Sequence, residues 1–423
     1  MSIMTDAHSI NEVIGTRAPL RILVVHNAYQ WRGGEDVVKD AEVALLRERG
    51  QVVETYERDN ASINGMSSLQ AARQTLWSSQ TTAELRQRIE AFGPDLIHVH
   101  NSFPLVSPSL YWEAARARVP VIQTLHNFRM LCPQAMFLRE DRVCEDCLGK
   151  VPWRGVVRGC YRGSVAQTAV VASMLTVHRA VGTYSNKVAR YIALNQFCRD
   201  KFIEGGLPGE RFSIKPNFVS VPDGPEVARR GGLFVGRLSR EKGIAVLLKA
   251  LDRPDGPTLD MIGTGPMESE VVAHPKVRGL GAMARTEVLD AMRRASYLVL
   301  PSIWHEVMPL SVVEAFACGL PVIGSRSGAL GELIEAGVTG LLCEPGNPDD
   351  LARTIAWAES HPEVMREMGR RARAEYVAKY TPQRNYEQLM TIYREVIGQA
   401  QPKRRALRVL AGEAENKIQE TQT

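Results

Sequence analysis

The sequence predicts an α/β protein made of two doubly wound domains. The chain has 423 residues, which is too long for one ordinary core and suits two domains. Short apolar runs alternate with helix-like stretches along nearly its whole length, a pattern typical of parallel sheets with crossover helices. Hydrophobic residues make up 44% and charged residues 23% of the chain, as in soluble globular proteins.

The apolar runs are predicted to be strands, because each is followed by a loop with Gly or Pro and then by a helical pattern. In the first half they are residues 20–25, 52–56, 95–100, 120–125 and 191–194. In the second half they are residues 232–235, 258–262, 277–280, 297–300 and 321–323. Each half is therefore expected to form its own sheet.

The boundary between the halves is expected at residues 216–225, which are rich in proline and turn formers. This gives a first domain at 18–220 and a second at 226–380. The stretch 381–400 is expected to be a C-terminal helix. The tail from 401 starts with basic residues and then becomes polar, as in a surface helix or a disordered end.

The most informative stretch runs from Pro301 to Ile323. It reads as a strand end, a loop with Glu306, a helix start with Glu314, and another buried strand. Pro309 suits the first turn of a helix, where free N–H groups form an anion site. Carboxylates accept hydrogen bonds from sugar hydroxyls. A ligand that is both a phosphate and a sugar fits both demands.

A second informative stretch, from Gly236 to Gly243, opens the second domain. Arg237 and Lys242 lie five residues apart in a loop that follows a strand, where ligands of open α/β sheets bind. Such cations can clamp a diphosphate. The alternative is a solvated loop in which Glu241 is the ionic partner.

Both stretches resemble signatures of glycosyltransferase family 4, the E-x7-E and GR-x3-EKG patterns. The resemblance extends to about Pro348 and includes residues 319–323 and 337–341. It implies a GT-B fold, with two Rossmann-like domains facing across a cleft. The first domain would bind the acceptor and the second a nucleotide sugar, and the helix at 381–400 would return to the first domain.

The resemblance also implies residue roles. Arg237 and Lys242 would bind the donor diphosphate, Glu306 would face the donor sugar, and Glu314 would hold the ribose hydroxyls. Catalysis would rest on Arg237, Lys242, Glu306 and His126, the last at the end of a predicted strand and facing the cleft. The alternative for His126 is a hydrogen-bonded structural residue.

The helix start departs from the family pattern, because residues 307–310 replace a glycine-rich segment. The backbone N–H groups of Met308 and Leu310 could still meet phosphate, whereas Pro309 has none to donate.

Two glycine pairs are further candidates. Gly263 and Gly265 follow a predicted strand, and a nucleotide contact there is about as plausible as a plain turn. Gly33 and Gly34 precede a helix in the first domain and suit an acceptor or phosphate. His98 and His100 share one strand face, as core and rim residues.

Four of the seven cysteines cluster in a loop-like insertion at about 130–163, namely Cys132, Cys144, Cys147 and Cys160. Thiolates at this spacing can close a structural zinc site, and free thiols are the alternative. No cofactor is expected for catalysis, because fixed cations can stabilise the leaving diphosphate.

The same insertion carries Trp153, Arg154, Arg158, Tyr161 and Arg162. Basic and aromatic residues together suit an anionic lipid surface or a lipid-phosphate acceptor, so peripheral membrane association is a candidate property. The following stretch, 165–181, is largely apolar, and a buried helix is favoured over a membrane-facing one.

The charge balance limits the partners. A net charge of +5 suits anionic ligands but is too small to predict nucleic-acid binding. No run of 18 apolar residues predicts a membrane span, and Met1–Pro19 does not resemble a secretion signal. A cytoplasmic location, with contact to the inner face of the membrane, is the expectation.

The sequence therefore predicts a retaining glycosyltransferase that moves a sugar from a nucleoside-diphosphate sugar to a glycan or lipid-linked acceptor. Surface polysaccharide synthesis is its expected setting, by analogy alone. Two alternatives stay open. One is a sugar-nucleotide epimerase or hydrolase on the same scaffold, and the other is an inactive protein that only binds a nucleotide sugar.

Overall fold

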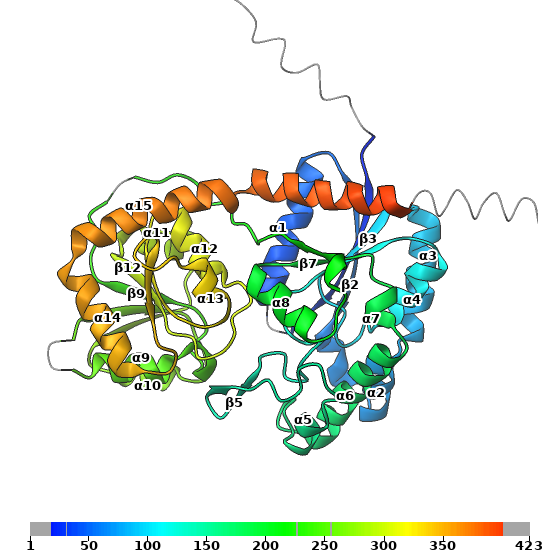
Figure 1. The fold of residues 1–423 in the computed structure, drawn as a ribbon, viewed down its shortest axis with the longest axis horizontal. Helices are drawn as coiled ribbons and strands as arrows, with labels where there is room; N and C mark the ends of the chain where they lie inside the picture. Colours follow the sequence, from blue (N-terminus) through cyan, green and yellow to red (C-terminus); the bar gives the residue numbers. More distant parts are fainter. Residues whose placement is uncertain (1–17, 31, 226, 254–255, 401–423) are drawn as a thin grey trace, which may run out of the picture.

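The computed structural model describes residues 18–30, 32–225, 227–253 and 256–400. Figure 1 shows two α/β lobes side by side, with two consecutive helices, α15 (Pro362–Lys379) and residues 382–400, lying across the second and the first lobe in turn. Each lobe is a six-stranded sheet in which all neighbouring strands are parallel. This is the doubly wound architecture that the alternation of apolar runs and helices predicts.

The first sheet has the strand order β2-β1-β3-β4-β7-β8. Its strands are β1 (Arg21–Ala28), β2 (Val52–Asp59), β3 (Leu96–Val99), β4 (Val121–Thr124), β7 (Arg190–Ala193) and β8 (Phe212–Ile214). Its helices are α1 (Gly34–Glu48), α2 (Ser68–Leu76), α3 (Ser79–Phe92), α4 (Ser109–Arg116), α6 (Val165–Ala180), α7 (Thr183–Asn186) and α8 (Gln196–Glu204), with 3-10 turns η1 (Asn60–Gly65) and η2 (Gly209–Arg211). β3 and β4 are buried throughout because helices cover both faces of the sheet.

The second sheet has the order β11-β10-β9-β12-β13-β14. Its strands are β9 (Gly232–Val235), β10 (Leu259–Ile262), β11 (Val277–Gly281), β12 (Tyr297–Leu300), β13 (Val322–Ser325) and β14 (Gly340–Cys343). Its helices are η3 (Arg240–Lys242), α9 (Ile244–Leu251), α10 (Glu268–Ala273), α11 (Arg285–Arg294), α12 (Leu310–Ala317), α13 (Gly328–Leu333), α14 (Pro348–Ser360) and α15 (Pro362–Lys379).

Each sheet contains one strand more than the sequence predicts. The additional strands, β8 and β14, lie at sheet edges and have three and four residues. The segment of β8, Phe-Ser-Ile, has a serine at its centre, and the segment of β14, Gly-Leu-Leu-Cys, directly follows the loop residues 337–339.

The strand orders fix where ligands can bind. In both sheets the order reverses beside the first strand, between β1 and β3 and between β9 and β12. The crevice outside the carboxyl ends of strands at such a switch point is the usual ligand site of open α/β sheets. The loops after β9 and β12 contain Arg237, Lys242 and Glu306, and the loops after β1 and β3 contain Gly33 and His100.

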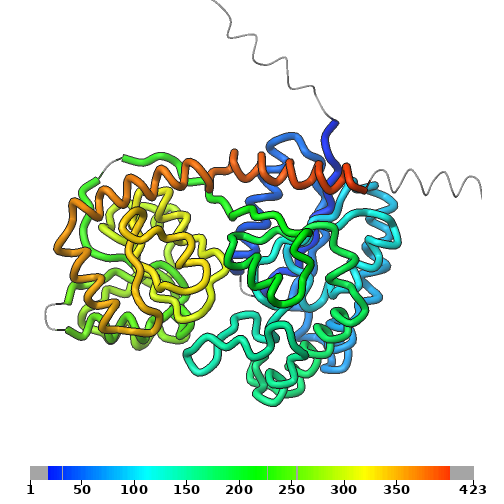
Figure 2. Tube along the Cα trace, in the orientation of Figure 1, coloured from blue at the N-terminus to red at the C-terminus, as the bar shows by residue number. Residues whose placement is uncertain are grey.

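The final helix ties the two lobes together. Residues 382–400 are helical, and in Figures 1 and 2 this orange-to-red segment lies across the top of the first lobe. Its apolar side chains Leu389, Met390 and Tyr393 pack in a buried cluster with Ile22 of β1 and Leu46 of α1.

Polar contacts also join the lobes near the cleft. Glu332 of α13 accepts hydrogen bonds from the backbone N–H groups of Gln196 and Phe197, at 2.9 and 2.7 Å. These N–H groups are the free donors of the first turn of α8, so a carboxylate of one domain is held at a helix N-terminus of the other.

The cysteine-containing insertion hangs from the first lobe. It holds the two-stranded hairpin β5 (Leu138–Arg139) and β6 (Arg142–Val143), followed by the short helix α5 (Trp153–Val157). In Figure 1 the hairpin extends toward the second lobe, while α5 lies at the lower extremity of the first. One face of α6 is buried, as expected for residues 165–181, but its first residue Val165 is exposed.

No helix among the described residues has both the length and the apolar character needed to cross a bilayer. The basic tail from residue 401 and nearly all of Met1–Pro19 lie outside the described residues.

Candidate active site

The centre of the site in the second domain is an ion pair. Lys242, at the end of η3, donates a hydrogen bond from Nζ to Oε1 of Glu306 at 2.7 Å. Ser302 donates to the same oxygen at 2.7 Å. Glu306 is buried, whereas the Lys242 side chain keeps 20% of its surface exposed. Two of the four residues expected to bind the donor thus touch directly, and the ammonium group still reaches solvent.

Backbone packing explains why this loop ends in glycine. Gly243 has φ 74°, and a Cβ at this position would lie 1.9 Å from the carbonyl oxygen of Pro301. The backbone N–H of Ile303 also donates to the Glu241 carbonyl at 3.0 Å. The loops after β9 and β12 are therefore in direct contact, which brings Lys242 to Glu306.

Arg237 stands at the start of the same loop. Its side chain is exposed, and it forms no ion pair with any described residue. The preceding residue, Gly236, has φ 158°, and its carbonyl oxygen would lie 1.9 Å from a Cβ on Gly263. Arg237 is thus a cation on a fixed backbone whose side chain is available to a ligand.

Gly263 and Gly265 also have a packing role. A Cβ on Gly265 would lie 2.4 Å from the carbonyl oxygen of Leu238, and the N–H of Leu238 donates to the Thr264 carbonyl at 2.9 Å. Both glycines let two loops approach closely, so loop packing alone explains why glycine stands at these positions. A nucleotide contact at these residues stays a prediction.

The start of α12 differs slightly from expectation. Pro309 is the N-cap residue, with Leu310 as the first helical residue, rather than a member of the first turn. The N–H groups of Met308 and Leu310 have no hydrogen-bond acceptor among the described residues, so both are free to meet an anion. The Met308 side chain is buried, and its sulfur accepts a hydrogen bond from the N–H of Asn217 at 3.1 Å.

Glu314 lies one turn into α12, and its ionic partner differs from that of Glu306. Its Oε1 is 3.3 Å from Nε of Arg285, on the neighbouring helix α11. Burial raises the pKa of Glu314, and Arg285 only partly offsets this effect. The sequence did not indicate Arg285 as a partner.

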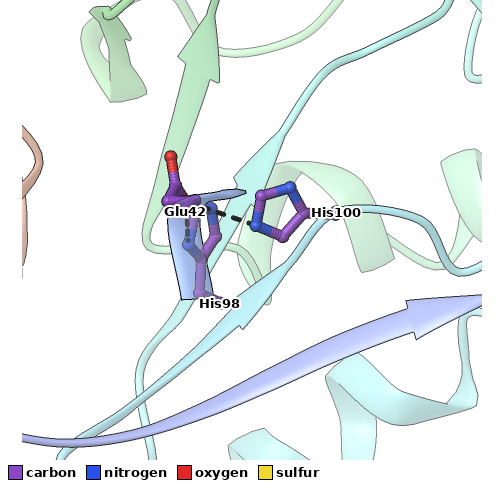
Figure 3. A group of neighbouring side chains, drawn as sticks. All are labelled: Glu42, His98 and His100. Atoms are coloured by element: carbon purple, nitrogen blue, oxygen red, sulfur yellow. Dashed lines mark ion pairs between the residues drawn. The ribbon is translucent and has the colours of Figure 1, made fainter. Parts of the chain in front are cut away.

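His126, the candidate from the first domain, belongs to a chain of histidines. Its Nε2 lies 2.9 Å from Nδ1 of His100, and the two rings are stacked with centroids 5.2 Å apart. His100 in turn points its Nε2 at Oε1 of Glu42, 3.3 Å away. Figure 3 shows Glu42 of α1 meeting His98 and His100, which come from the end of β3.

The buried carboxylate at the end of this chain is balanced by a lysine. Lys215 donates from Nζ to Oε2 of Glu42 at 2.8 Å, and both side chains are almost fully buried. Tyr393 of the final helix places its hydroxyl 2.7 Å from Nδ1 of His98. The last helix therefore reaches the polar network behind His126.

Burial sets the protonation of this network. It lowers the pKa values of His98, His100 and His126, so all three are neutral at pH 7. Burial alone would raise the pKa of Glu42, but Lys215 and the histidines outweigh it, and the pKa lies well below its ordinary value. The network therefore consists of one ion pair and neutral imidazoles.

Glu42, His98 and His100 also have the composition of a metal site. Their ligand atoms lie within 4.8 Å of one another, and they are the one such group of three among the described residues. However, Lys215 already neutralises Glu42, and both nitrogens of His98 face hydroxyls, those of Tyr393 and Thr124. A cation here would face a fixed ammonium group, so the chemistry fits a charge-balanced core better than a metal centre.

In the glycine loop of the first domain, one backbone N–H group already has a hydrogen-bond acceptor. Gly33 caps α1, and its N–H donates to Oδ2 of Asp36 at 2.7 Å. A Cβ on Gly34 would meet open space. A phosphate at this loop would have to compete with Asp36 for the Gly33 donor.

Glu35 is a cleft residue that the sequence reading missed. Asn127, next to His126, donates to its Oε1 at 2.6 Å, while Oε2 is buried with no partner among the described residues. Burial raises the pKa of this carboxyl. The second oxygen of this carboxylate, whose first oxygen is held by Asn127, is suited to accept a hydrogen bond from a hydroxyl group.

A cavity lies beside His126. Its volume is only about 40 Å³, and it is lined by both polar and apolar side chains, including His126, Arg129, Phe103, Met174 and Leu175. Met174 and Leu175 come from α6, so the helix that follows the insertion forms one wall.

The four cysteines of the insertion are free thiols in the structure. Cys132 and Cys147 are buried, and Cys147 is close enough to the other three for their charges to act on its pKa, which burial raises. No three of these sulfurs meet within 4.8 Å in the described part of the chain. Structural zinc stays a prediction.

The insertion also reaches the loop that carries Glu306. Glu145, between two of the cysteines, lies 3.1 Å from Nε2 of His305 and accepts from Lys201 at 2.9 Å. Asp141 in the hairpin pairs with Arg240 of η3. No sequence pattern indicated these contacts, because their partners are far apart along the chain.

Two family models match the chain. "Glycosyl transferases group 1" covers residues 229–375, and "Glycosyl transferase 4-like domain" covers residues 24–217. The two matches correspond to the two lobes and lie on either side of the proline-rich boundary.

Curated relatives and solved structures agree. An uncharacterized glycosyltransferase of Methanocaldococcus jannaschii is 33% identical over 261 residues, which is 56% of this chain and 73% of the relative. A D-rhamnosyltransferase of Pseudomonas aeruginosa is 34% identical over 157 residues, 35% of this chain and 41% of that protein. The Anabaena protein HepE, solved with UDP-glucose, has a TM-score of 0.62 at 19% identity and covers 88% of this chain and 99% of its own.

Proposed function

This chain belongs to the family 4-like glycosyltransferases of the GT-B fold, and we propose that it is a retaining enzyme that uses a nucleoside-diphosphate sugar. The second domain would hold the donor, and the first would present a glycan or lipid-linked acceptor. The observation that carries the proposal is the Lys242–Glu306 pair at the carboxyl edge of the second sheet, with Arg237 available beside it. The solved complex of HepE with UDP-glucose supports this kind of donor.

Lys242 and Glu306 would each bind a different part of such a donor. The diphosphate would attract Lys242 and Arg237, and the free N–H groups of Met308 and Leu310 can meet further phosphate oxygens. Glu306, still held by Ser302, would then accept hydrogen bonds from sugar hydroxyls. Breaking the sugar–phosphate bond moves negative charge onto the diphosphate, and preorganised donors of this kind lower the barrier by roughly 3–4 kcal/mol each.

Glu314 is the proposed ribose ligand. This carboxyl group is partly buried, has a raised pKa and contacts Arg285. It lies on α12, the helix whose start would face the phosphates. Ribose hydroxyls would supply the hydrogen bonds that burial withholds from this carboxyl.

In the first domain, His126 acts as a neutral group. A carboxylate cannot donate, so we place the His100 proton on Nε2, which faces Oε1 of Glu42 across 3.3 Å outside hydrogen-bond geometry. His100 Nδ1 then accepts from His126 Nε2–H, which leaves Nδ1 of His126 as an acceptor. A neutral imidazole with a free acceptor nitrogen suits the hydroxyl groups of a sugar or acceptor.

Retention would follow from attack on the face from which the diphosphate departs. The bond from the anomeric carbon to the diphosphate oxygen breaks as the bond to the acceptor oxygen forms. The acceptor proton passes to the leaving diphosphate. Because fixed cations stabilise that leaving group, transfer is proposed to need no catalytic divalent metal, and full activity without added Mg²⁺ or Mn²⁺ is the expected result.

The biological setting is proposed to be surface polysaccharide assembly at the inner face of the membrane. A lipid-linked acceptor agrees with the apolar residues Phe103, Met174 and Leu175 in the partly polar wall of the cavity beside His126.

The proposed function is tested in two steps. A panel of nucleoside-diphosphate sugars is screened by thermal shift, since a ligand that binds the folded form raises the melting temperature. The donor found is then incubated with glycan and lipid-linked acceptors, and the product linkage is read by NMR. A product that keeps the donor's anomeric configuration is expected. An inverted product would refute retention, and donor consumed by isomerisation or hydrolysis alone would refute transfer.

The zinc hypothesis has its own test. Elemental analysis after gentle purification is expected to find about one zinc per chain, the stoichiometry of a four-thiolate structural site. Less than about half an equivalent would end the hypothesis, because structural zinc binds too tightly to be lost in mild handling.

A further inference from the structure

The segment from Cys147 to Arg199 has an unusual charge. It contains eight lysines and arginines and no aspartate or glutamate, although the net charge of the whole chain is only +5. Its acidic neighbours before Cys147 are mostly paired elsewhere, Asp141 with Arg240 and Glu145 with Lys201 and His305. Four of the eight, Lys150, Arg154, Arg158 and Arg162, lie on the insertion, whereas α6 carries only Arg179.

Large apolar side chains are exposed in the same segment. Trp153 and Val157 of α5 keep 59% and 71% of their surface exposed, and Val151 and Val165 on either side keep 59% and 55%. Soluble proteins expose single apolar residues freely, but neighbouring ones mark contact surfaces.

The two kinds of side chain form adjacent stripes on α5. Trp153 and Val157 are four residues apart and share one helical face, and Arg154 and Arg158 form the next stripe. Gly155 lies on the inner side, against Pro133 and Cys147, which fixes the direction in which the stripes point. We call the set Lys150, Val151, Trp153, Arg154, Val157, Arg158, Arg162 and Val165 the α5 surface.

The cations on this surface are largely available. Arg154 and Arg158 share one acidic partner, Asp146, at 3.9 and 2.6 Å. Arg162 is exposed and lies over the ring of Tyr161, with 5.5 Å between its guanidinium carbon and the ring centroid. The α5 surface has four cations, Lys150, Arg154, Arg158 and Arg162, and Asp146 neutralises only one of their charges. The surface therefore has a net positive charge.

We propose that the α5 surface docks this protein onto an anionic lipid bilayer. An anionic bilayer supplies phosphates for the arginines and an apolar layer for Trp153 and Val157, which lie side by side here. The position of α5 at an extremity of the first lobe allows it to enter an interface without a clash from the rest of the lobe (Figure 1).

The surface is connected to the cavity beside His126. Tyr161, next to Arg162, packs edge-on against Phe103, and the guanidinium of Arg129 lies over both rings. Phe103 and Arg129 line the cavity, together with Met174 and Leu175 of α6. A docked α5 surface would hold this cavity close to the membrane. This link to a lipid-linked acceptor rests on the proposed function, whereas the docking itself does not.

Vesicle sedimentation tests the docking. Full-length protein is mixed with vesicles of phosphatidylcholine alone or with about one-third phosphatidylglycerol, at low and at physiological salt. Binding is expected only with the anionic lipid and should weaken with salt. The double variant Trp153→Ser/Val157→Ser should bind at least about tenfold more weakly, since two apolar anchors are lost. Replacing Lys150, Arg154 and Arg162 by Gln should weaken binding roughly fivefold per charge.

Two matched variants in the second domain serve as controls, Val272→Ser for the apolar side chains and Arg353→Gln for the charges. Both positions are exposed, at 66% for Val272 and 63% for the Arg353 side chain, and neither should change binding. All variants should keep the wild-type melting temperature and the thermal shift with donor, which separates loss of docking from loss of fold or of the proposed function.

Three results would overturn the proposal. One is no sedimentation of the wild type with anionic vesicles at low salt. Another is binding that the α5-surface variants leave unchanged. The last is binding that depends on the arginines but not on Trp153 and Val157, because electrostatic attraction alone is not docking in which the apolar stripe enters the bilayer.

Discussion

At the scale of single residues, the site depends on groups that hold one another before any ligand arrives. Glu306 is buried between Lys242 and Ser302, so its position is fixed by two hydrogen bonds. His126 is held by His100, which is in turn held by the charge-balanced Glu42. Preorganised groups of this kind need not reorganise during the reaction.

Glu306→Gln tests the role of this charge. The amide is of similar size and can still accept from Lys242, but the charge that balances the ammonium is lost. We expect kcat to fall by about 10²–10³, as when one preorganised polar group is removed, while donor affinity changes by less than about tenfold. The measurement is steady-state kinetics beside calorimetric donor binding. Unchanged kcat would show that Glu306 does not take part in transfer.

The buried histidines predict a pH dependence of stability. His98, His100 and His126 have pKa values below the ordinary value of 6.5, so the unfolded chain binds more protons as the pH falls below that value. Stability is therefore full above about pH 6.5 and is lost as the pH falls toward the folded-state values, by up to about 1.4 kcal/mol per pH unit for each histidine. Glu42, with a lowered pKa, adds a further loss below its unfolded value of 4.5.

Thermal melts between pH 8 and about pH 5 measure this effect. His126→Asn should reduce the change of melting temperature with pH, since one of the three titrating groups is gone. His361→Asn should leave that change as in the wild type, because His361 is exposed on the surface of the second domain. A wild-type melting temperature that does not change across this range would contradict the account.

At the scale of elements, the loops after β9 and β12 are built around glycines that no other residue can replace. Gly243 has φ 74° and lies against the Pro301 carbonyl. Gly263 packs in the same way against Gly236. The motif glycines are therefore explained first by loop packing, which then sets the positions of Arg237 and Lys242.

Gly243→Ala should destabilise the second domain by about 2 kcal/mol or more, because it adds backbone strain and a steric overlap. Gly65→Ala is the matched control, since a Cβ at Gly65 meets nothing within 4 Å, and it should change stability by less than about 0.5 kcal/mol. Urea unfolding measures both. Equal stability of the two variants would show that the close packing of these loops is not required.

The elements show what sequence reasoning can and cannot reach. Long apolar runs such as Ile22–Val25 identified the inner strands, because a buried parallel strand must be apolar on both faces. The edge strand β8 was missed because it has only three residues with a serine at the centre, whereas β14 is as long as several inner strands and was missed because it directly follows the loop residues 337–339. The two family motifs singled out Lys242 and Glu306 separately, but they did not predict that the two side chains pair. Glu42, Lys215 and Tyr393 could not be predicted, because only the tertiary fold brings them to the histidines.

At the scale of the whole molecule, the two domains are joined from several sides. The final helix leaves the second domain and packs on β1 and α1, and its Tyr393 reaches the histidine network. Glu332 holds the N-terminus of α8, and the cysteine-containing insertion touches His305 beside Glu306. Groups from both domains therefore border the site, as transfer between two bound substrates requires.

Calorimetric titration of the donor found by thermal shift tests the central claim most directly. The wild type, Lys242→Ala, Arg237→Ala and the control Lys249→Ala, an exposed lysine of α9, are compared. Lys242→Ala and Arg237→Ala should each weaken donor binding by about tenfold or more, since a charge-assisted hydrogen bond contributes about 1.5–3 kcal/mol. Lys249→Ala should bind the donor like the wild type. Donor affinity that is the same in all four proteins would contradict a diphosphate site at the carboxyl edge of the second sheet.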